Sequence, residues 1–474
     1  MTTTHLGQIF HVAGQPTVTD ASRALVWLPD GALVVDDAGD IIYCGPRDSR
    51  PRPAAPGAEA IHDHGSGFLI PGFVDTHLHF PQTYSTDAYG GGHLLNWLDS
   101  CVFPAEARLA DPEFAARTAR NFTARRIAAG TTAAMVFGSA FPHAQEALFT
   151  ATERAGLRIV SGRGIQTAGP ASAAPLMTTE RAAIELADDE IRRWHGTDSD
   201  DPRSSLRHVA IVPRFGLSVT TTTLAALGEL YDSTRDRGVY MHTHLSENIH
   251  EIDLVRESFG VDGYLDVFDG RFQRGSRTGG SSLLGRRTIL AHAVHCNDDE
   301  LSRMAETGSS IAHCPVSQLF LGSGTMPWRR TVAAGVTVAA GTDVGAGDEW
   351  LISRVLSDAY KVHLSEPGDA GVAMHPAEML FTGTLAGARA LDLEDRIGNF
   401  DVGKQADFLV IDAGRWAPLE SILAHGVRAD DETLARDQIL FGLLMGLREP
   451  AIAEVHVQGR RVTAPPVPPP GCRI

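Results

Sequence analysis

Lysine is almost absent from this chain of 474 residues. Only Lys361 and Lys404 are lysines, and the rest of the 41 basic residues are arginines. No lysine precedes Lys361, so a metal site built from the earlier part of the chain cannot use a lysine side chain. Positive charge is also in deficit, since the formal net charge is −17. We therefore expect no nucleic-acid partner, because binding to a phosphate backbone depends on an excess of basic side chains.

Cysteine is scarce as well, and its spacing excludes two classes of protein. The five cysteines contain no C-x-x-C pair and are odd in number; they are Cys44, Cys101, Cys296, Cys314 and Cys472. This pattern argues against a disulfide framework and against a cysteine zinc knuckle, and it fits a reducing compartment. The chain also lacks an apolar run long enough to span a bilayer and an N-terminal segment of secretory type. We expect a cytoplasmic protein that has no membrane partner.

Alternating strands and helices fill the middle of the chain. The candidate strands lie at residues 68–77, 131–137, 156–164, 208–215, 238–245, 287–295, 308–315 and 335–343. Helical segments lie between them, such as residues 112–130 and 298–308. Eight such units predict an α/β fold in which eight strands close a β/α barrel of the TIM type.

Short strands separated by turn residues mark both ends of the chain. One hairpin signature runs from Val34 to Tyr43, and strand-like segments return after Ile397. We expect both ends to join in one small β-sandwich domain. The predicted boundaries are 1–68 and 397–474 for this domain, which ends in a proline-rich tail, and 69–396 for the catalytic barrel.

Histidines and acids occupy the ends of five of the eight candidate strands. His77 and His79 follow the first strand, and alternation along a strand sends both imidazoles in the same direction. The other strand-end residues are His242, His244, Glu247, His292, His295, His313 and Asp343. In a β/α barrel these ends gather on one face, where catalytic residues lie. One such histidine would be explained by packing, whereas five strand ends favour a metal site with about four ligands.

Several motifs are similar to those of the amidohydrolase superfamily. The shared framework is "PGFVDTHLH", "HLSE", "AH", "HCP" and "GTD". Within the aminohydrolase branch the chain most resembles the guanine deaminases, through the stretches His79–Gln82, Leu94–Glu106 and Val212–Ser218 and through "IGNFDVGKQADFLV". One departure is Gln318, where related aminohydrolases carry asparagine after "HCP".

The resemblance implies a role for individual residues. It makes His77, His79, His244 and Asp343 the metal ligands. His242 is an alternative to His244, but the H-x-x-E spacing favours His244. Glu247 becomes the proton shuttle, and His292 binds the reacting water or substrate edge together with Asp343. The purine would be held by Gln82, Arg214, Phe215 and Trp97, although Phe215 and Trp97 could equally be packing residues.

The same resemblance fixes the number of metal ions. Members of this superfamily that bind two metal ions share a carboxylated lysine on a middle strand, which bridges the ions. Lys361 follows the eighth candidate strand and Lys404 lies in the terminal domain, so neither can form such a bridge. We expect one divalent ion per chain, zinc by preference and iron as an alternative.

The activity implied is the hydrolytic deamination of guanine to xanthine and ammonia in purine catabolism, by a homodimer. The alternative activities on the same scaffold are the deamination of 8-oxoguanine, an adenosine-type ligand or a triazine. Hydrolysis that releases chloride is a further alternative. A non-catalytic scaffold is disfavoured because no metal ligand is missing. The deaminase class that binds zinc through P-C-x-x-C is excluded, since that motif does not occur.

Overall fold

The computed structural model describes residues 1–16, 20–52, 59–85, 93–199, 205–274, 277–367 and 371–466. Two compact units group these residues. The first contains Met1–Asp75, Arg125–Ala133 and Trp350–Ala464, and the second is mainly Thr76–Ala124 and Ala134–Glu349. The domain boundaries predicted from the sequence stay a prediction. Most of the proline-rich tail, from residue 467 onward, lies outside the described residues.

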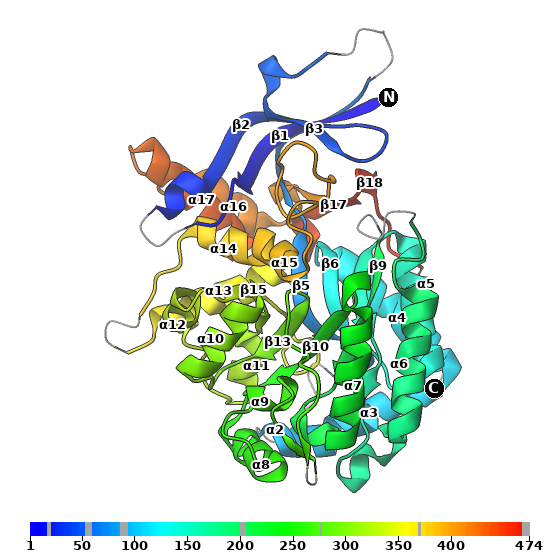
Figure 1. Cartoon of the computed structure of the whole chain (residues 1–474). Coiled ribbons are helices and arrows are strands. Elements are labelled where there is room, and N and C mark those ends of the chain that lie inside the picture. The colour runs from blue at the N-terminus through cyan, green and yellow to red at the C-terminus, as the bar shows by residue number, and fades with distance from the viewer. Residues whose placement is uncertain are drawn as a thin grey trace. The chain divides into compact units, whose positions relative to one another are not determined.

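Eight parallel strands form a nearly closed barrel, as the sequence predicted (Figure 1). They are β5 (Phe73–His79), β6 (Thr131–Phe137), β7 (Arg158–Gly162), β9 (Arg207–Pro213), β10 (Tyr240–Leu245), β13 (Thr288–His292), β14 (Ser310–His313) and β15 (Thr337–Ala340). The short β8 (Gly164–Ile165) also pairs with β9. Most of these strands are buried along their whole length, which explains their continuous apolar runs.

The two ends of the barrel sheet meet beside the histidines of β5. Asp343 N donates to His77 O at 2.8 Å, and His79 N donates to Val344 O at 3.0 Å. The segment that follows β15 is thereby fixed against the end of β5. Strand ends that are far apart in the sequence therefore come together on one face of the barrel.

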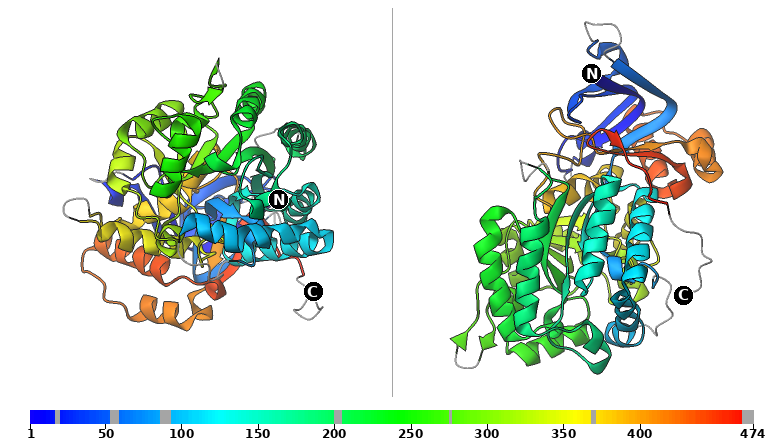
Figure 2. Two further views of the ribbon diagram at one scale, coloured as in Figure 1. Left: turned by 90° about the horizontal axis from the view of Figure 1, so that it is seen from below. Right: turned by 90° about the vertical axis from the view of Figure 1, so that its right-hand side faces the viewer.

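Helices connect the barrel strands in sequence and surround them (Figure 2). The longer ones are α4 (Pro112–Ala128), α5 (Pro142–Ala155), α6 (Glu180–Trp194), α7 (Thr221–Thr234), α8 (Ile249–Phe259) and α10 (Asp298–Thr307). Shorter ones are α2 (Leu94–Trp97), α3 (Phe103–Ala107), α9 (Leu265–Phe268), α11 (Pro315–Phe320) and α12 (Trp328–Ala333). Among the described residues, no helix combines the length and apolar character needed to cross a membrane.

Both ends of the chain contribute to a second, seven-stranded mixed sheet. Its order is β18 (Arg460–Arg461), β17 (Ile452–Val457), β16 (Phe408–Ile411), β4 (Glu59–Pro71), β1 (Thr2–Val12), β2 (Leu25–Val35) and β3 (Ile41–Pro46). The hairpin predicted at Val34–Tyr43 is the β2–β3 connection. Helices α13 (Ile352–Leu364), α14 (Pro376–Gly383), α15 (Leu385–Ala390), α16 (Ala417–His425) and α17 (Glu432–Gly446) belong to the same unit.

The first candidate strand, predicted at residues 68–77, is in fact divided. Its apolar beginning belongs to β4 of the mixed sheet, and only Phe73 onward enters the barrel as β5. The break falls at Gly72, whose N–H donates to Asp407 O at 3.0 Å. A Cβ at Gly72 would lie 2.2 Å from Thr132 Oγ1, so only glycine allows this close approach. The prediction was wrong about the continuity of this strand because both partners are distant in the sequence.

The mixed sheet buries a histidine among other aromatic rings. His5 on β1 is 2% exposed and packs against His62, His64, Phe408 and His456. Its Nδ1 lies 3.1 Å from His64 Nε2. Burial, followed by the neighbouring histidines, lowers the pKa of His5 from 6.5 to about 2. The folded sheet therefore holds His5 neutral.

This burial predicts a loss of stability in mild acid. The unfolded chain binds a proton at His5 below pH 6.5 and the folded chain does not, so the free energy of unfolding falls by about 1.4 kcal/mol per pH unit on acidification. Between pH 6.5 and 4.5 His5 contributes about 2–3 kcal/mol of this loss. Denaturant titrations across this range should show a shallower dependence for His5→Phe, while the control His425→Phe on the surface of α16 should match the wild type. Equal pH slopes for His5→Phe and wild type would contradict the assignment.

Candidate metal centre and active site

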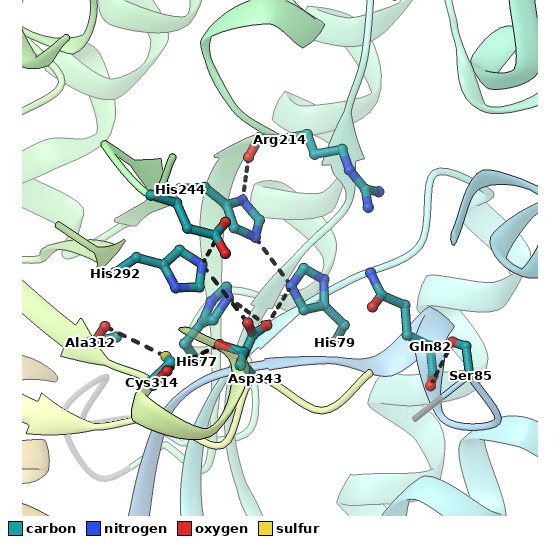
Figure 3. A network of polar contacts seen from close by, with 12 residues as sticks. His77, His79, Gln82, Ser85, Arg214, His244, His292, Ala312, Cys314 and Asp343 are labelled. Carbon is teal, nitrogen blue, oxygen red and sulfur yellow. Dashed lines mark hydrogen bonds and ion pairs between the residues drawn. The ribbon is translucent and has the colours of Figure 1, made fainter. Parts of the chain in front are cut away.

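Four side chains from three strand ends converge on one point of the barrel face (Figure 3). His77 Nε2 and His79 Nε2 lie 3.1 and 3.2 Å from Asp343 Oδ1, and His79 Nε2 lies 3.2 Å from His244 Nε2. In a tetrahedral zinc site with bonds of 2.0–2.1 Å, neighbouring donor atoms are about 3.3 Å apart. Three of the distances among the predicted donors therefore match those expected around one small divalent ion.

His292 lies at the same centre and offers an alternative donor. The ligand atoms of His77, His244, His292 and Asp343 all lie within 4.8 Å of one another. His292 Nε2 is 3.9 Å from Asp343 Oδ2 and 3.5 Å from Glu247 Oε2. Both of its ring nitrogens are buried and find no hydrogen-bond partner among the described residues. This position, between the donor cluster and Glu247, suits a group that contacts the reacting water or substrate.

His242 is turned away from the donors and supports one of them. Its Nδ1 contacts the carbonyl of Ile289 at 2.8 Å, and its Nε2 contacts His77 Nδ1 at 2.7 Å. Because a carbonyl only accepts, His242 carries its proton on Nδ1 and accepts at Nε2 from His77. His77 then keeps a lone pair on Nε2, the atom that faces Asp343. The carbonyl of Arg214, 2.6 Å from His244 Nδ1, fixes the tautomer of His244 in the same way.

Removal of this support is expected to weaken metal binding. His242→Phe keeps a ring but removes the acceptor for His77, and such changes behind a ligand typically cost 10–100-fold in metal affinity. Competition with a chelator would measure the loss. Thr118→Val on α4 is the matched control, since Thr118 is equally buried and its Oγ1 donates to the Phe114 carbonyl of the same helix, at 2.8 Å. An affinity unchanged in His242→Phe would contradict this role.

Glu247 combines burial with a nearby negative charge. Burial, then Asp343 and Glu251, raises its pKa well above 4.5, against a hydrogen bond from Ser323 Oγ to Oε1 at 3.2 Å. Burial would also raise the pKa of Asp343, but its contacts with the His77 and His79 imidazoles hold that pKa well below 3.8. The pKa values of the two carboxyl groups are thus shifted in opposite directions, so Asp343 stays ionised and Glu247 can hold a proton. Such a pair is typical of general acid–base chemistry.

Strained backbone occurs at two of these groups and at the residue before Glu247. Ser246, His292 and Asp343 have φ values of 47, 72 and 51°, in the left-handed region that non-glycine residues seldom adopt. Each lies at or just after the end of a barrel strand. Strain of this kind persists only where the surrounding structure requires it, and it is common at active sites.

All of the predicted substrate residues line the cavity in front of the donors. Gln82, Trp97, Arg214 and Phe215 share it with His79, His244, Glu247, His292 and Asp343. Trp97 and Phe215 also pack in a buried apolar cluster with Phe103, so they contribute both to packing and to the cavity wall. Figure 3 shows Gln82 and Arg214 on the same side of the histidine cluster as His79.

The residues that line the cavity do not include His295, His313 or Gln318, to which the sequence assigned no role. His295 contacts the carbonyl of Ser323 at 2.7 Å through Nε2, and Ser323 in turn donates to Glu247. His313 packs its ring against Trp328 at 5.8 Å. Gln318 on α11 is buried, and neither amide atom finds a hydrogen-bond partner among the described residues. Nothing in the structure explains why glutamine, rather than asparagine, occupies position 318.

Sequence reasoning missed a residue that contacts two of the side chains lining the cavity. Glu106 on α3 is buried and contacts both Gln82 and Arg214. The sequence feature that could have identified Glu106 is its position as the last residue of the Leu94–Glu106 stretch, which carries part of the resemblance to the guanine deaminases. No spacing rule connects a helix residue there with a strand end more than a hundred positions later.

Metal-assisted hydrolysis is the chemistry that this fold and these donors define. The chain belongs to the amidohydrolase family, which matches residues 68–446. It is 39% identical over 417 residues to a probable guanine deaminase of Deinococcus radiodurans, covering 87% of this chain and 89% of the relative. It is 32% identical over 446 residues to the guanine deaminase of Escherichia coli, covering 94% and 93%. The solved structure of Escherichia coli guanine deaminase superposes with a TM-score of 0.84 at 30% identity, covering 98% of this chain and all of that one.

Proposed function

We propose that the protein is a guanine deaminase, which converts guanine and water to xanthine and ammonia. The observation that carries the proposal is one cavity lined by two kinds of group. Metal donors and Glu247 line it together with Arg214, Gln82 and Phe215, which can bind a planar heterocycle. The likeness to guanine deaminases over nearly the whole chain supports this choice among heterocycles.

We propose zinc as the metal, with one ion per chain held by His77, His79, His244 and Asp343. When bound, the ion lowers the pKa of water from about 15.7 towards 7 and so supplies a nucleophile at neutral pH. The donor spacing supports a single site, and the two lysines lie outside it in the sequence. Iron would fit the same nitrogen and oxygen donors.

Glu247 accepts the proton of the attacking water and delivers it to N3 of the purine. Its raised pKa lets the carboxyl hold that proton until the ring nitrogen takes it. This makes C2 electrophilic, and attack there forms a tetrahedral carbon. The proton of the new C2 hydroxyl then passes through Glu247 to the amino group, the C2–N bond breaks, and ammonia leaves. Asp343, which stays ionised, and His292, whose pKa burial lowers to about 3, orient the water.

Arg214 and Gln82 bind the purine in the same cavity. The guanidinium is a rigid donor fork that suits a carbonyl oxygen, and the amide offers a donor and an acceptor. Phe215 covers a face of the ring. Adenine carries its amino group at C6 and has no carbonyl there, so the donors of Arg214 would face another donor.

The proposal also covers the setting of the reaction. We propose a homodimer in the cytoplasm that acts in purine catabolism. The four described cysteines form no disulfide among the described residues, which supports a reducing compartment. Light scattering that gives a mass twice that of the chain would support the dimer, and the mass of one chain would overturn it.

Ammonia release from guanine tests the function directly. We expect equal amounts of xanthine and ammonia from the purified protein, loss of turnover on treatment with a chelator, and recovery with zinc. The absence of xanthine from a preparation with one equivalent of metal would overturn the proposal.

A further inference from the structure

A buried carboxylate joins two of the polar side chains that line the cavity. Glu106 Oε1 accepts a hydrogen bond from Gln82 Nε2 at 2.8 Å, and Glu106 Oε2 accepts one from Arg214 Nη1 at 2.6 Å. All three residues are nearly inaccessible, at 3% for Glu106 and 2% for each partner. Both carboxylate oxygens of Glu106 therefore accept hydrogen bonds from protein groups, and Glu106 affects the cavity through Gln82 and Arg214.

This contact decides which way the Gln82 amide points. An ionised carboxylate accepts and cannot donate, so Gln82 must turn its NH₂ group towards Glu106. Its Oε1 is then left buried, with no hydrogen-bond partner among the described residues. Because Gln82 lines the cavity, we infer that this acceptor faces it. Glycine at position 345 makes room for this arrangement, since a Cβ there would lie 2.3 Å from Gln82 Oε1.

The same contact orients the donors of Arg214 and cancels their charge. Nη1 is engaged by Glu106, and the guanidinium lies 5.3 Å from the ring of Phe103 and 5.6 Å from that of Phe137. The planar fork is thus held on one side by the carboxylate and lies near both rings. The buried ion pair has no net charge, which suits a neutral heterocycle.

We propose that Glu106 is a positioning residue that sets the order of acceptor and donors on the cavity wall and so selects the purine edge. The inference rests on the proposed function and deepens it. Guanine places a ring N–H at N1 beside a carbonyl at C6, which matches the acceptor of Gln82 and the donors of Arg214. In 2,6-diaminopurine the order is reversed: N1 accepts, and the C6 amino group donates. Both purines carry the same leaving amino group at C2, so the chemistry at the metal is the same.

The test compares kcat/KM for guanine and 2,6-diaminopurine in the wild type and in Glu106→Gln. The variant keeps the size of the side chain but has only one acceptor atom, so the Gln82 amide is free to reverse. We expect the preference for guanine over 2,6-diaminopurine to fall at least about tenfold, with metal content unchanged. Glu106→Asp keeps the charge and should keep the preference even if activity falls.

A double variant guards against misfolding of the single one. Gln82→Glu combined with Glu106→Gln exchanges the amide and the carboxylate, which restores an acceptor facing the cavity, so the wild-type preference should return. An equal loss of both activities in Glu106→Gln would show a merely structural role and overturn the inference, as would a preference that stays lost in the double variant. A wild type that is inactive on guanine would overturn the proposed function and the inference together.

Discussion

Replacement of Glu247 with glutamine is expected to lower guanine turnover by about 10²–10⁴-fold while one equivalent of metal stays bound. Glutamine has nearly the same size and keeps one oxygen atom near Ser323 Oγ, which lies 3.2 Å from Glu247 Oε1. It cannot take a proton from water and pass it to the ring. The loss should therefore appear in kcat rather than in metal content, and steady-state kinetics with elemental analysis measures both.

Glu300→Gln is a matched control for this change. Glu300 is also buried, at 3%, but its oxygen atoms accept hydrogen bonds from the backbone N–H groups of Leu265 and Asn297. Its replacement should lower the melting temperature and leave kcat nearly unchanged. A Glu247→Gln enzyme that retains metal and turns over guanine at a near-normal rate would reject the role of Glu247 as the proton shuttle.

The second large effect is expected for Asp343→Asn. Asp343 Oδ1 is the one carboxylate atom that contacts both His77 and His79, so an amide there removes the negative charge that complements the ion. Loss of bound metal removes several kcal/mol of transition-state stabilisation, or at least about 10³-fold in turnover, since 1.36 kcal/mol corresponds to tenfold. Asparagine tolerates the left-handed backbone at this position, where φ is 51°, so the fold should survive.

Metal content and turnover should fall together in Asp343→Asn, and excess zinc should restore only part of the activity. Asp348→Asn serves as the control, because Asp348 is exposed and follows in the same segment. It should keep full metal content and activity. Full metal occupancy in Asp343→Asn would remove this carboxylate from the ligand set.

The sequence was informative about the barrel because its strands are buried on both faces. Such strands read as continuous apolar runs, and their ends are marked by the first polar side chains. Period-two alternation sends His77 and His79 in the same direction, and the structure shows both beside Asp343. The positions of these side chains follow from local geometry, which a single sequence contains.

What the sequence could not provide were contacts between distant segments. His242 and His244 leave β10 in the same direction, and only the structure shows that His242 lies 2.7 Å from His77 instead of joining the donors. The link from Glu106 to Arg214 spans 108 positions and carries no local signal. The division of the first predicted strand at Gly72 depends on Thr132 and Asp407 for the same reason.

The most direct test of the account is the relative kcat/KM for guanine, 8-oxoguanine, adenine and a triazine, measured on one metal-loaded preparation. The account predicts that guanine is the best of the four by at least about tenfold, because only a matched set of buried donors and acceptors rejects the analogues this strongly. Adenine should be the poorest purine, since it lacks the carbonyl that faces Arg214. If another member of the panel equals or exceeds guanine, the assignment to guanine is contradicted and only a metal-dependent amidohydrolase remains.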